Sequence, residues 1–381
     1  MTVRGKVAIV GVGLAGLAGE ERHSAMGLSA LAATRALADA QLSLVDVDGL
    51  FASSSSQNFP AMSAAEYLGI QPRFVEGAMV GGSSPQQHVL TAALALEAGL
   101  CDVALVLYGS NQRSAGRSLQ SRAEPQFLED INAPRNPIGS YALAAARHMH
   151  QYGTTRAQLD EVIVAAREWA ILNPRARANR PITAGELAAA TPIADPFTSF
   201  DCCLVTDGAG ALVLTRAERA ADHAHIPAYL LGAAGTVTHR QISQMPDLTR
   251  TGAAFTGPAA FAMAGLDTGD VDLVRLYDAF SINTILFLED LGFCPKGEGG
   301  AFVSNGAIAP GGRLPVNTNG GGLSFLHPGM YGIFLIIEAV EQLRGTCGER
   351  QVKGAQVALA HGNGGVLGAQ ATTIFGTGAT L

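Results

Sequence analysis

The chain has 381 residues, of which 48% are hydrophobic and 15% charged, so a large buried core is expected and disorder is not. Its net charge of −7 argues against a nucleic-acid partner, which selects for a basic face. No run reaches about 18 uninterrupted apolar residues, so we expect no membrane span. The start lacks an export-signal pattern, and the five cysteines lack metal-ligand spacing. We therefore expect a cytoplasmic protein with reduced thiols and no bound metal.

Apolar strands alternate with helical stretches in the first part of the chain. We predict strands at 6–11, 47–52, 74–80, 103–108 and 208–214, and helices at 24–40 and 84–99. Ser84 is the expected N-cap of the second helix, and Pro85 suits its first position. This order predicts an α/β fold with parallel strand pairing and helices on both faces of the sheet. Between about 111 and 196 the pattern lapses, and we interpret that stretch as an insertion covering the site, with helices at 141–151 and 156–170.

A second half is predicted to begin near residue 226. Its expected strands are 228–233, 273–277, 356–360 and 371–375, and its expected helices are 252–264, 282–291 and 333–343. The order resembles that of the first half, although no residue-level repeat proves a duplication. We therefore predict two pseudo-equivalent halves, 1–225 and 226–381.

Three polar clusters follow predicted strands, where an α/β sheet places its ligands. They are Gly81-Gly82-Ser83-Ser84-Pro85, Tyr277-Asp278-Ala279-Phe280-Ser281 and His361-Gly362-Asn363-Gly364-Gly365. Free N–H groups at the helix start after the first cluster favour an anion or a developing oxyanion. Plain helix caps explain the first two clusters equally well, through Ser84 in one and Asp278 or Ser281 in the other.

A glycine-rich passage at 317–332 delivers His327 to the start of the predicted helix 333–343. Glycines this dense allow the backbone to approach a ligand. A histidine beside a substrate can act as a general base near neutral pH. His327 and His361, each in a glycine-rich loop, are therefore candidate catalytic groups, and a hydrogen-bonded core histidine is the alternative for each.

Neither a dinucleotide-binding fold nor a serine hydrolase is favoured by the sequence. Gly11-Val12-Gly13-Leu14-Ala15-Gly16 resembles the GxGxxG of dinucleotide-binding folds, but no clear helix or acidic ribose partner follows at the expected distance. A serine hydrolase is disfavoured because the chain has no GxSxG elbow.

Together these residues resemble the thiolase superfamily, in the branch of the sterol carrier protein thiolases and the bacterial acetyl-CoA acetyltransferases. Asn319-Gly320-Gly321…His327-Pro328-Gly329 is similar to the N-x-GG…GHP-x-G motif of that family. Tyr277-Asp278-Ala279-Phe280-Ser281 is similar to H/Y-D-x-F-[TS], and the loop at His361 sits where the family has its C-terminal Cys- or His-bearing glycine loop. The resemblance covers nearly the whole chain.

The resemblance implies a five-layer αβαβα fold built from two βαβαβαββ halves, a homodimer, and a CoA thioester as substrate with no other cofactor. It assigns His327 to an oxyanion hole for the thioester carbonyl, with Tyr277 supporting that hole. It assigns His361 as acid or base at the α-carbon. We place Asp278 with these catalytic residues. The expected substrate contacts are Gly81, Gly82, Ser83, Ser84, Asn319 and Gly364.

One departure from the family pattern changes the expected chemistry. The nucleophilic cysteine of the family lies in a pattern like E-x-A-C-x-S-G, whereas this chain has Glu76-Gly77-Ala78-Met79-Val80-Gly81-Gly82. Met79 has a thioether, which has no ionisable proton and cannot form an acyl-enzyme as a thiolate does. Enolate chemistry needs only carbonyl polarisation and proton transfer, and retro-aldol cleavage of a β-hydroxyacyl-CoA is of that type.

The superfamily includes steroid side-chain aldolases in which the cysteine is also replaced, and which work with a small OB-fold and zinc-ribbon subunit. This chain keeps His327-Pro328 where those aldolases depart from the GHP pattern. We therefore favour a carbon–carbon lyase acting on a bulky acyl-CoA, with such a partner subunit as an expectation. The alternatives are a catalytically silent acyl-CoA-binding scaffold and an acyltransferase that uses Ser83 or Ser84 as its nucleophile.

Overall fold

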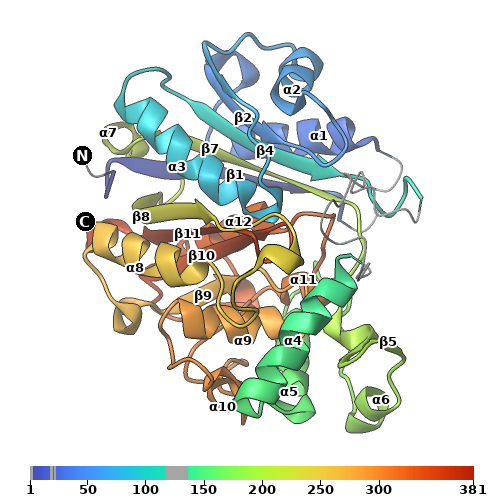
Figure 1. Ribbon diagram of the computed structural model, residues 1–381. Coiled ribbons are helices and arrows are strands. Elements are labelled where there is room, and N and C mark those ends of the chain that lie inside the picture. Colours follow the sequence, from blue (N-terminus) through green and yellow to red (C-terminus); the bar gives the residue numbers. More distant parts are fainter. Residues whose placement is uncertain (1–2, 18–19, 21–22, 117–135) are drawn as a thin grey trace.

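The computed structural model describes residues 3–17, 20, 23–116 and 136–381 (Figure 1). Residues 117–135, part of the predicted covering insertion, lie outside the described residues. One sheet of nine strands runs in the order β3-β2-β4-β7-β1-β8-β11-β10-β9. Its strands are β1 (Val7–Ala15), β2 (Gly49–Ser53), β3 (Phe74–Glu76), β4 (Ala104–Ser110), β7 (Gly208–Arg216), β8 (Ala228–Val237), β9 (Leu273–Leu276), β10 (Val357–Gly364) and β11 (Ala369–Gly376). A small second sheet pairs β5 (Pro192–Ala194) with β6 (Phe197–Thr198).

The sheet is mixed, so the prediction of parallel pairing is wrong for part of it. β2 pairs in parallel with β3 and β4, and β9 pairs in parallel with β10. β7 is antiparallel to β1 and β4, and β11 is antiparallel to β8 and β10. β10 and β11 are joined by a tight hairpin, and a hairpin forces antiparallel pairing whereas a helical crossover permits parallel pairing.

The strands on the two sides of the β1–β8 junction form two layers, and helices lie outside each layer and between them, which gives the predicted five-layer αβαβα fold (Figure 1). The helices are α1 (Ala25–Asp39), α2 (Pro60–Leu68), α3 (Ser84–Glu97), α4 (Ile138–Tyr152), α5 (Arg156–Ile171), α6 (Ala184–Ala188), α7 (Ala217–Ala220), α8 (Ala253–Ala264), α9 (Ser281–Asp290), α10 (Gly299–Val303), α11 (Gly321–Ser324) and α12 (Gly332–Leu343). α1 and α2 cover the strands of the N-terminal part, and α8 and α9 contact those of the C-terminal part. α3 and α12 lie between the two sets of strands and contact both.

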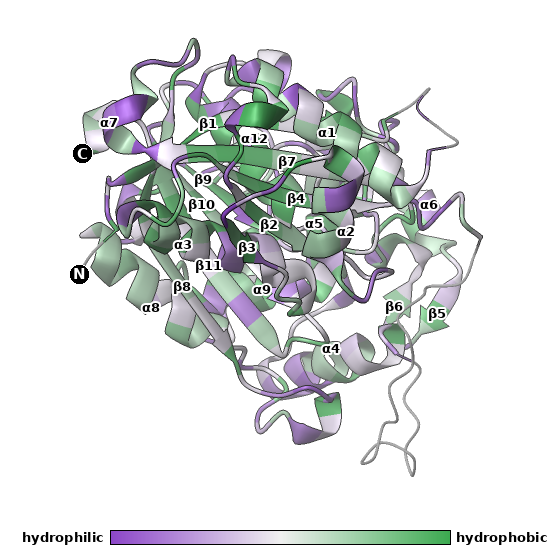
Figure 2. Cartoon of the chain, turned by 90° about the horizontal axis from the view of Figure 1, so that it is seen from above, coloured by the Kyte–Doolittle hydropathy of each residue, from purple (hydrophilic) through white to green (hydrophobic). Residues whose placement is uncertain are grey.

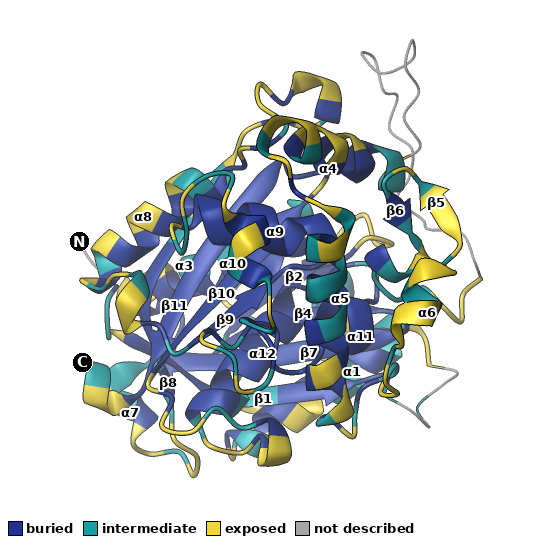
Figure 3. Cartoon of the chain, turned by 90° about the horizontal axis from the view of Figure 1, so that it is seen from below, coloured by how far each residue is buried: buried dark blue, intermediate teal, exposed yellow. Residues whose placement is uncertain are grey.

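Residues of the central strands, such as β2, β4 and β7, are buried on both faces, which explains why these strands are continuous apolar runs in the sequence. In β1, Ala8 and Val10 belong to the core under α1, whereas Val7 and Ile9 belong to the core around the central helices. Figure 2 shows the hydrophobic strands at the centre of the molecule, and Figure 3 shows that they are buried. The two sets of strands join where β1 meets β8 through two residue pairs. The boundary at 225/226 stays a prediction.

Two boundaries near the first glycine cluster differ from the sequence prediction. β3 ends at Glu76, so residues 77–80 lie outside the strand. α3 begins at Ser84 with Ser83 as its N-cap, one residue earlier than expected, because Gly81–Ser83 already form a 3-10 turn. Such a turn is common at a helix start.

The described part of the predicted insertion contains α4, α5 and α6. α4 and α5 both contact α9, and α5 also packs on α11, so this segment lies beside the loops of the C-terminal strands (Figure 1). None of the described helices combines the length and the apolar character needed to cross a bilayer. The five cysteines are free thiols.

Candidate active site

Tyr277 and His327 form the centre of the candidate site. The hydroxyl oxygen Oη of Tyr277 lies 3.1 Å from Nε2 of His327, although the two residues are 50 positions apart. The planes of their rings meet at 89°. Tyr277 follows β9 directly, and its backbone N–H donates to the carbonyl oxygen of His361 over 3.1 Å. The two residues are 5% and 8% exposed, so a ligand that reached them would be largely shielded from water.

Burial changes the acid–base chemistry of this pair. It raises the pKa of the Tyr277 hydroxyl well above its usual value, with a smaller contribution from the nearby Cys203, and it lowers the pKa of His327 to about 4. At neutral pH the phenol is therefore protonated and the imidazole neutral. The backbone N–H of Tyr331 donates to Oη of Tyr277 over 3.2 Å, which leaves the hydroxyl proton for His327 or a ligand. The pair can pass one proton.

The loop that carries His327 is fixed at two points. The backbone N–H of His327 donates to Oγ1 of Thr206 over 3.1 Å. The Tyr108 hydroxyl donates to the carbonyl oxygen of Pro328 over 2.5 Å and accepts from the N–H of Met330 over 3.1 Å. Tyr108 comes from β4, so the imidazole is positioned by a rigid strand as well as by its own loop.

Asp278 holds the glycine loop that precedes His327. Its carboxylate accepts from the N–H groups of Gly322, over 2.6 Å, and Leu323, over 3.3 Å. Gly321 has φ +64, and a Cβ there would overlap the carboxylate, so this close approach needs glycine. Burial raises the pKa of Asp278 to about 7, although the two N–H groups oppose that shift. The Asp278 carboxylate therefore fixes the backbone of this loop.

Asn319 occupies the interior behind His327. Its side-chain oxygen Oδ1 accepts from the guanidinium of Arg275, from the N–H of Gly321 over 3.0 Å and from the hydroxyl of Tyr331 over 3.0 Å. The Tyr331 ring in turn stacks on the His327 ring, with centroids 6.0 Å apart. Asn319 was predicted to contact substrate, and the structure instead commits its oxygen to this internal network.

The first glycine cluster lies directly against Tyr277. A Cβ on Gly82 would overlap the Tyr277 ring, so only glycine allows the phenol to approach the start of α3 this closely. Gly81 has φ +80 and packs on the backbone of Gly364, which itself lies against the carbonyl oxygen of Val80. The structure thus brings Gly81, Gly82 and Gly364 together beside the Tyr277–His327 pair.

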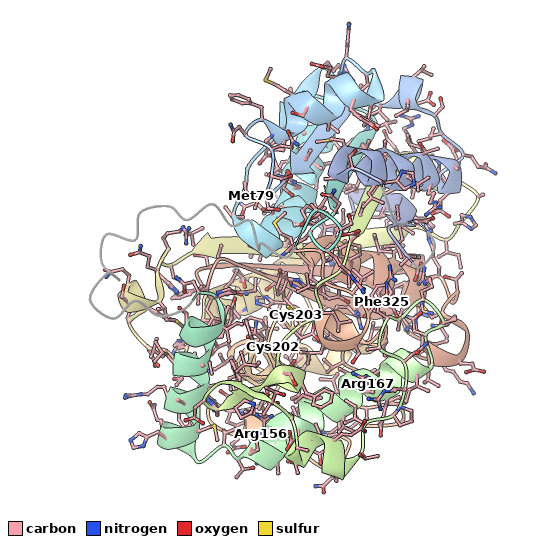
Figure 4. All side chains as sticks on the ribbon, turned by 90° about the vertical axis from the view of Figure 1, so that its right-hand side faces the viewer. Met79, Arg156, Arg167, Cys202, Cys203 and Phe325 are labelled. Atoms are coloured by element: carbon pink, nitrogen blue, oxygen red, sulfur yellow. The ribbon has the colours of Figure 1, made fainter. Side chains whose placement is uncertain are left out.

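The serines of the first cluster are tied into its backbone. The Ser83 hydroxyl donates to the carbonyl oxygen of Val80 over 3.3 Å. The Ser84 hydroxyl accepts from the N–H of Val80 over 2.9 Å and donates to the carbonyl oxygen of Gly81 over 2.7 Å. Neither hydroxyl is hydrogen-bonded to a base, which a nucleophilic serine requires. Met79 is 43% exposed, and its sulfur lies 3.8 Å from Oγ of Ser84 (Figure 4).

His361 does not join the pair, contrary to the expectation that two imidazoles meet at one carbonyl. A Cβ on Gly362 would overlap a side chain of α3, so His361, one residue earlier in β10, faces the opposite side of the sheet. There its ring contacts Phe287 of α9, with centroids 4.6 Å apart. Its Nδ1 lies 2.8 Å from Oγ1 of Thr372, and its Nε2 lies 2.8 Å from Oε1 of Gln370. The alternation of side chains along a strand accounts for the difference.

Cys203, labelled in Figure 4, is a cysteine that contributes to the raised pKa of Tyr277. Burial raises the pKa of Cys203 itself far above its usual value. It is therefore held as a thiol, and a thiol is a poor nucleophile.

One group among the described residues has the spacing of a metal site: Glu338, Glu341 and Cys347. Arg350 bridges both carboxylates, at 3.0 Å and 2.9 Å, and Arg175 pairs with Glu341. Burial raises the pKa of the Cys347 thiol, with Glu338 as the next cause. The arginines already neutralise the carboxylates, so we assign this group to the core.

Three tyrosines of the site were missed by the sequence analysis. Tyr331 donates to Tyr277 and stacks on His327, Tyr108 fixes the loop of His327, and Tyr141 of α4 packs on Phe280 with ring centroids 4.5 Å apart. A single tyrosine in an apolar segment reads as core. Only the position of Tyr331, four residues after His327 and just before a helix, was a usable signal.

The chain is similar in sequence and in structure to several known proteins. Residues 234–377 match the family described as Thiolase C-terminal domain-like. An acetyl-CoA acetyltransferase of Methanothermobacter thermautotrophicus is 42% identical over 62% of this chain and 62% of its own length, just under two thirds. A 17-hydroxy-3-oxo-4-pregnene-20-carboxyl-CoA lyase of Mycobacterium tuberculosis is 36% identical over 90% of this chain and 92% of its own. The solved structure of an Ltp2-ChsH2(DUF35) aldolase superposes with a TM-score of 0.88 at 30% identity, covering 99% of each chain.

Proposed function

This chain belongs to the thiolase superfamily, and we propose that it breaks a carbon–carbon bond next to the carbonyl of a CoA thioester by retro-aldol cleavage. The observation that carries the proposal is the hydrogen-bonded pair of Tyr277 and His327, seated against Gly82 beside a loop with Met79 in place of a thiol. A pair that exchanges one proton suits enolate chemistry. A thioether does not suit acyl transfer.

The reaction balances with the residues at hand. The hydroxyl proton of a β-hydroxyacyl-CoA leaves for Oη of Tyr277 as the phenol proton shifts to Nε2 of His327. The Cα–Cβ bond breaks, the β-carbon becomes a carbonyl, and the electron pair of the broken bond becomes the thioester enolate. The same pair then returns a proton to Cα, which gives a shorter acyl-CoA. No oxidant or second substrate is consumed.

The start of α3 is the proposed support for the enolate oxygen. Gly82 and Ser83 lie at the N-terminal end of that helix, where the aligned peptide dipoles give partial positive charge. Its contact with the Tyr277 ring places this end beside the reacting pair. His361 has no part in this scheme, and Asp278 and Asn319 act by holding the loop of His327.

An acyltransferase that uses Ser83 or Ser84 fits these contacts less well. Both hydroxyls donate to backbone carbonyls of their own turn, and activation of either would require breaking that contact and finding a base. We favour the lyase for this reason.

Coenzyme A enters the proposal as part of the substrate, and the acyl group is proposed to be bulky. The M. tuberculosis relative is named for a 17-hydroxy-3-oxo-4-pregnene-20-carboxyl-CoA, which carries a hydroxyl β to its thioester carbonyl. That thioester is therefore the first probe to use.

We also propose a homodimer and a partner subunit. β3 is an edge strand of the sheet, and the apolar side chains near it, Val75, Met79, Phe59 and Met62, are exposed. Exposed apolar groups at an open sheet edge favour pairing with a second copy. The similar solved structure is of an Ltp2-ChsH2(DUF35) aldolase, which supports a small OB-fold and zinc-ribbon subunit as the partner of this chain.

The test is cleavage of 17-hydroxy-3-oxo-4-pregnene-20-carboxyl-CoA, followed by liquid chromatography and mass spectrometry, with the purified chain alone and with a co-expressed DUF35 protein. A ketone and a shorter acyl-CoA should appear in equal amounts. Consumption of free CoA, or transfer of an acyl group to CoA, would point to the acyltransferase instead.

A further inference from the structure

We propose that His361 is a positioning residue: as a neutral imidazole it completes a directed network of hydrogen bonds that ends at Tyr141 and holds α4 against the glycine loop beside Tyr277. The inference rests on the proposed function, because it concerns the same site. It gives His361 a role other than acid or base at the α-carbon. The hydrogen-bond chain runs through side chains of α8, β11, β10 and α4.

The direction of this chain is fixed at Gln370. The side-chain nitrogen of Gln370 donates to the carbonyl oxygen of Leu367 over 3.0 Å, and a carbonyl can only accept. The same nitrogen donates to Oδ1 of Asn363 over 2.7 Å. Oε1 of Gln370 must therefore accept, so Nε2 of His361, 2.8 Å away, carries the proton.

The other imidazole nitrogen is then an acceptor. Nδ1 of His361 lies 2.8 Å from Oγ1 of Thr372 and accepts its hydroxyl proton. Oγ1 of Thr372 in turn lies 2.8 Å from Oγ1 of Thr256 in α8 and accepts from it. Both ring nitrogens are thus used. The residue is fully buried, and burial lowers its pKa to about 4. No nitrogen is left to take a proton from a substrate.

At its far end the chain reaches α4. Because Oδ1 of Asn363 accepts from Gln370, its nitrogen Nδ2 faces the Tyr141 hydroxyl and donates to it over 2.7 Å. The hydroxyl then donates to the carbonyl oxygen of Gly365 over 3.0 Å. The polarity of every link between the backbone carbonyls of Leu367 and Gly365 follows from those two acceptors.

This end of the chain lies beside the reacting pair. The Tyr141 ring packs on Phe280, three residues after Tyr277, and Tyr141 contributes to the pKa shift of Tyr277. The loop at Gly365 contacts Gly81 of the first glycine cluster. His361 thereby reaches the site through Gln370, Tyr141 and the glycine loop, and loss of its Nε2–H would leave the buried Oε1 of Gln370 without that donor.

The test is a set of His361 variants in the retro-aldol assay. His361→Gln carries one donor and one acceptor and does not titrate, so it can preserve the polarity of the chain. We expect its kcat/KM to stay within about threefold of the wild type with an unchanged pH profile, whereas His361→Ala loses about tenfold or more. A loss of about a hundredfold in His361→Gln, together with loss of one limb of the pH profile, would make His361 an acid–base residue and overturn the proposal.

A second measurement does not depend on activity. His361→Ala, Tyr141→Phe and the double variant are unfolded in urea, and the double variant should be clearly less destabilised than the sum of the single ones, because the two residues share one network. Strict additivity would contradict the relay. Failure of the proposed function has a different signature, namely no cleavage of the steroid thioester by the wild type, and that outcome leaves the urea cycle interpretable.

Discussion

Oη of Tyr277 lies 3.1 Å from Nε2 of His327, and the backbone N–H of Tyr331 donates to the same hydroxyl over 3.2 Å. When His327 is protonated, the phenol oxygen therefore has two hydrogen-bond donors, Nε2–H of His327 and the N–H of Tyr331. Both stabilise negative charge on that oxygen. Burial lowers the pKa of His327 to about 4 and raises that of Tyr277, so a protonated imidazole beside a phenolate is a short-lived arrangement. This suits a group that must give the proton back within the same turnover.

Removing the phenol hydroxyl tests this relationship. Tyr277→Phe keeps the ring that packs on Gly82 but cannot transfer a proton, so kcat should fall by about a hundredfold or more. Steady-state kinetics on the steroid thioester measures it. Tyr67→Phe is the matched control, because that side chain is exposed on α2 and should behave as the wild type. A Tyr277→Phe enzyme with normal kcat would remove the phenol from the mechanism.

The contact of Gly82 with the Tyr277 ring leads to a second prediction. Gly82→Ala would place a Cβ inside that ring, so the phenol must shift and kcat/KM should fall by about a hundredfold. Gly77→Ala is the control in the same loop, because the nearest atom to its added Cβ is 3.5 Å away. Equal activity of the two variants would show that the tight packing of Tyr277 on α3 is not needed.

Asp278 should act through the loop it holds. In Asp278→Asn one of the two N–H groups that the carboxylate now accepts from would face an amide NH2, which costs about 1–3 kcal/mol of unfolding free energy. We expect urea denaturation to show that loss, with a smaller decrease in kcat than in Tyr277→Phe. A stable Asp278→Asn enzyme that is as inactive as Tyr277→Phe would instead place the carboxylate in the chemistry.

Buried neutral histidines predict a steep loss of stability in acid. Burial lowers the pKa of His88, His327 and His361 to about 4 in each case, against 6.5 in an exposed side chain. Between those values the unfolded chain binds protons that the folded chain refuses, so the free energy of unfolding falls as pH falls, by up to roughly 3 kcal/mol per histidine.

Asp278 acts in the opposite sense over the same window. Its pKa is raised to about 7, so its contribution to the free energy of unfolding is lost as pH rises and regained as pH falls. This gain in acid offsets roughly the loss that one of the three histidines causes. Urea denaturation at intervals between about pH 7 and pH 4.5 should show a net loss, and His361→Gln should reduce the slope. A flat profile would mean that these imidazoles are charged or exposed in the folded protein.

The sequence predicted much of this architecture for physical reasons. Continuous apolar runs such as 103–108 and 208–214 mark strands buried on both faces. The helix predicted over 24–40 is α1, and the structure adds that Ser24 caps it by accepting from the N–H of Gly27. The thiolase-like fold and the family follow from the resemblance of three motifs taken together, those at Asn319–Gly329, Tyr277–Ser281 and His361–Gly365. The antiparallel pairing of β10 with β11 was not predicted, because the spacing of apolar runs in the sequence does not reveal that β11 returns by a hairpin.

The site shows where such reasoning stops. His327 and Tyr277 meet, as their motifs suggested. His361 lies in an equally glycine-rich segment, yet the structure places it inside strand β10, where the alternation of side chains turns it towards α9. Composition and spacing carry no information about that register. Tyr108 and Tyr141 were missed for a similar reason, since a lone tyrosine in an apolar segment is compatible with ordinary core packing.

The most direct test of the account is the intact mass of the wild-type protein, quenched with acid while it turns over 17-hydroxy-3-oxo-4-pregnene-20-carboxyl-CoA. Because Met79 offers no thiolate and both serine hydroxyls are engaged with backbone carbonyls, the protein should keep its unmodified mass while ketone accumulates. A protein mass increased by an acyl group, formed and lost at the rate of turnover, would contradict cleavage through a free enolate and establish a covalent route.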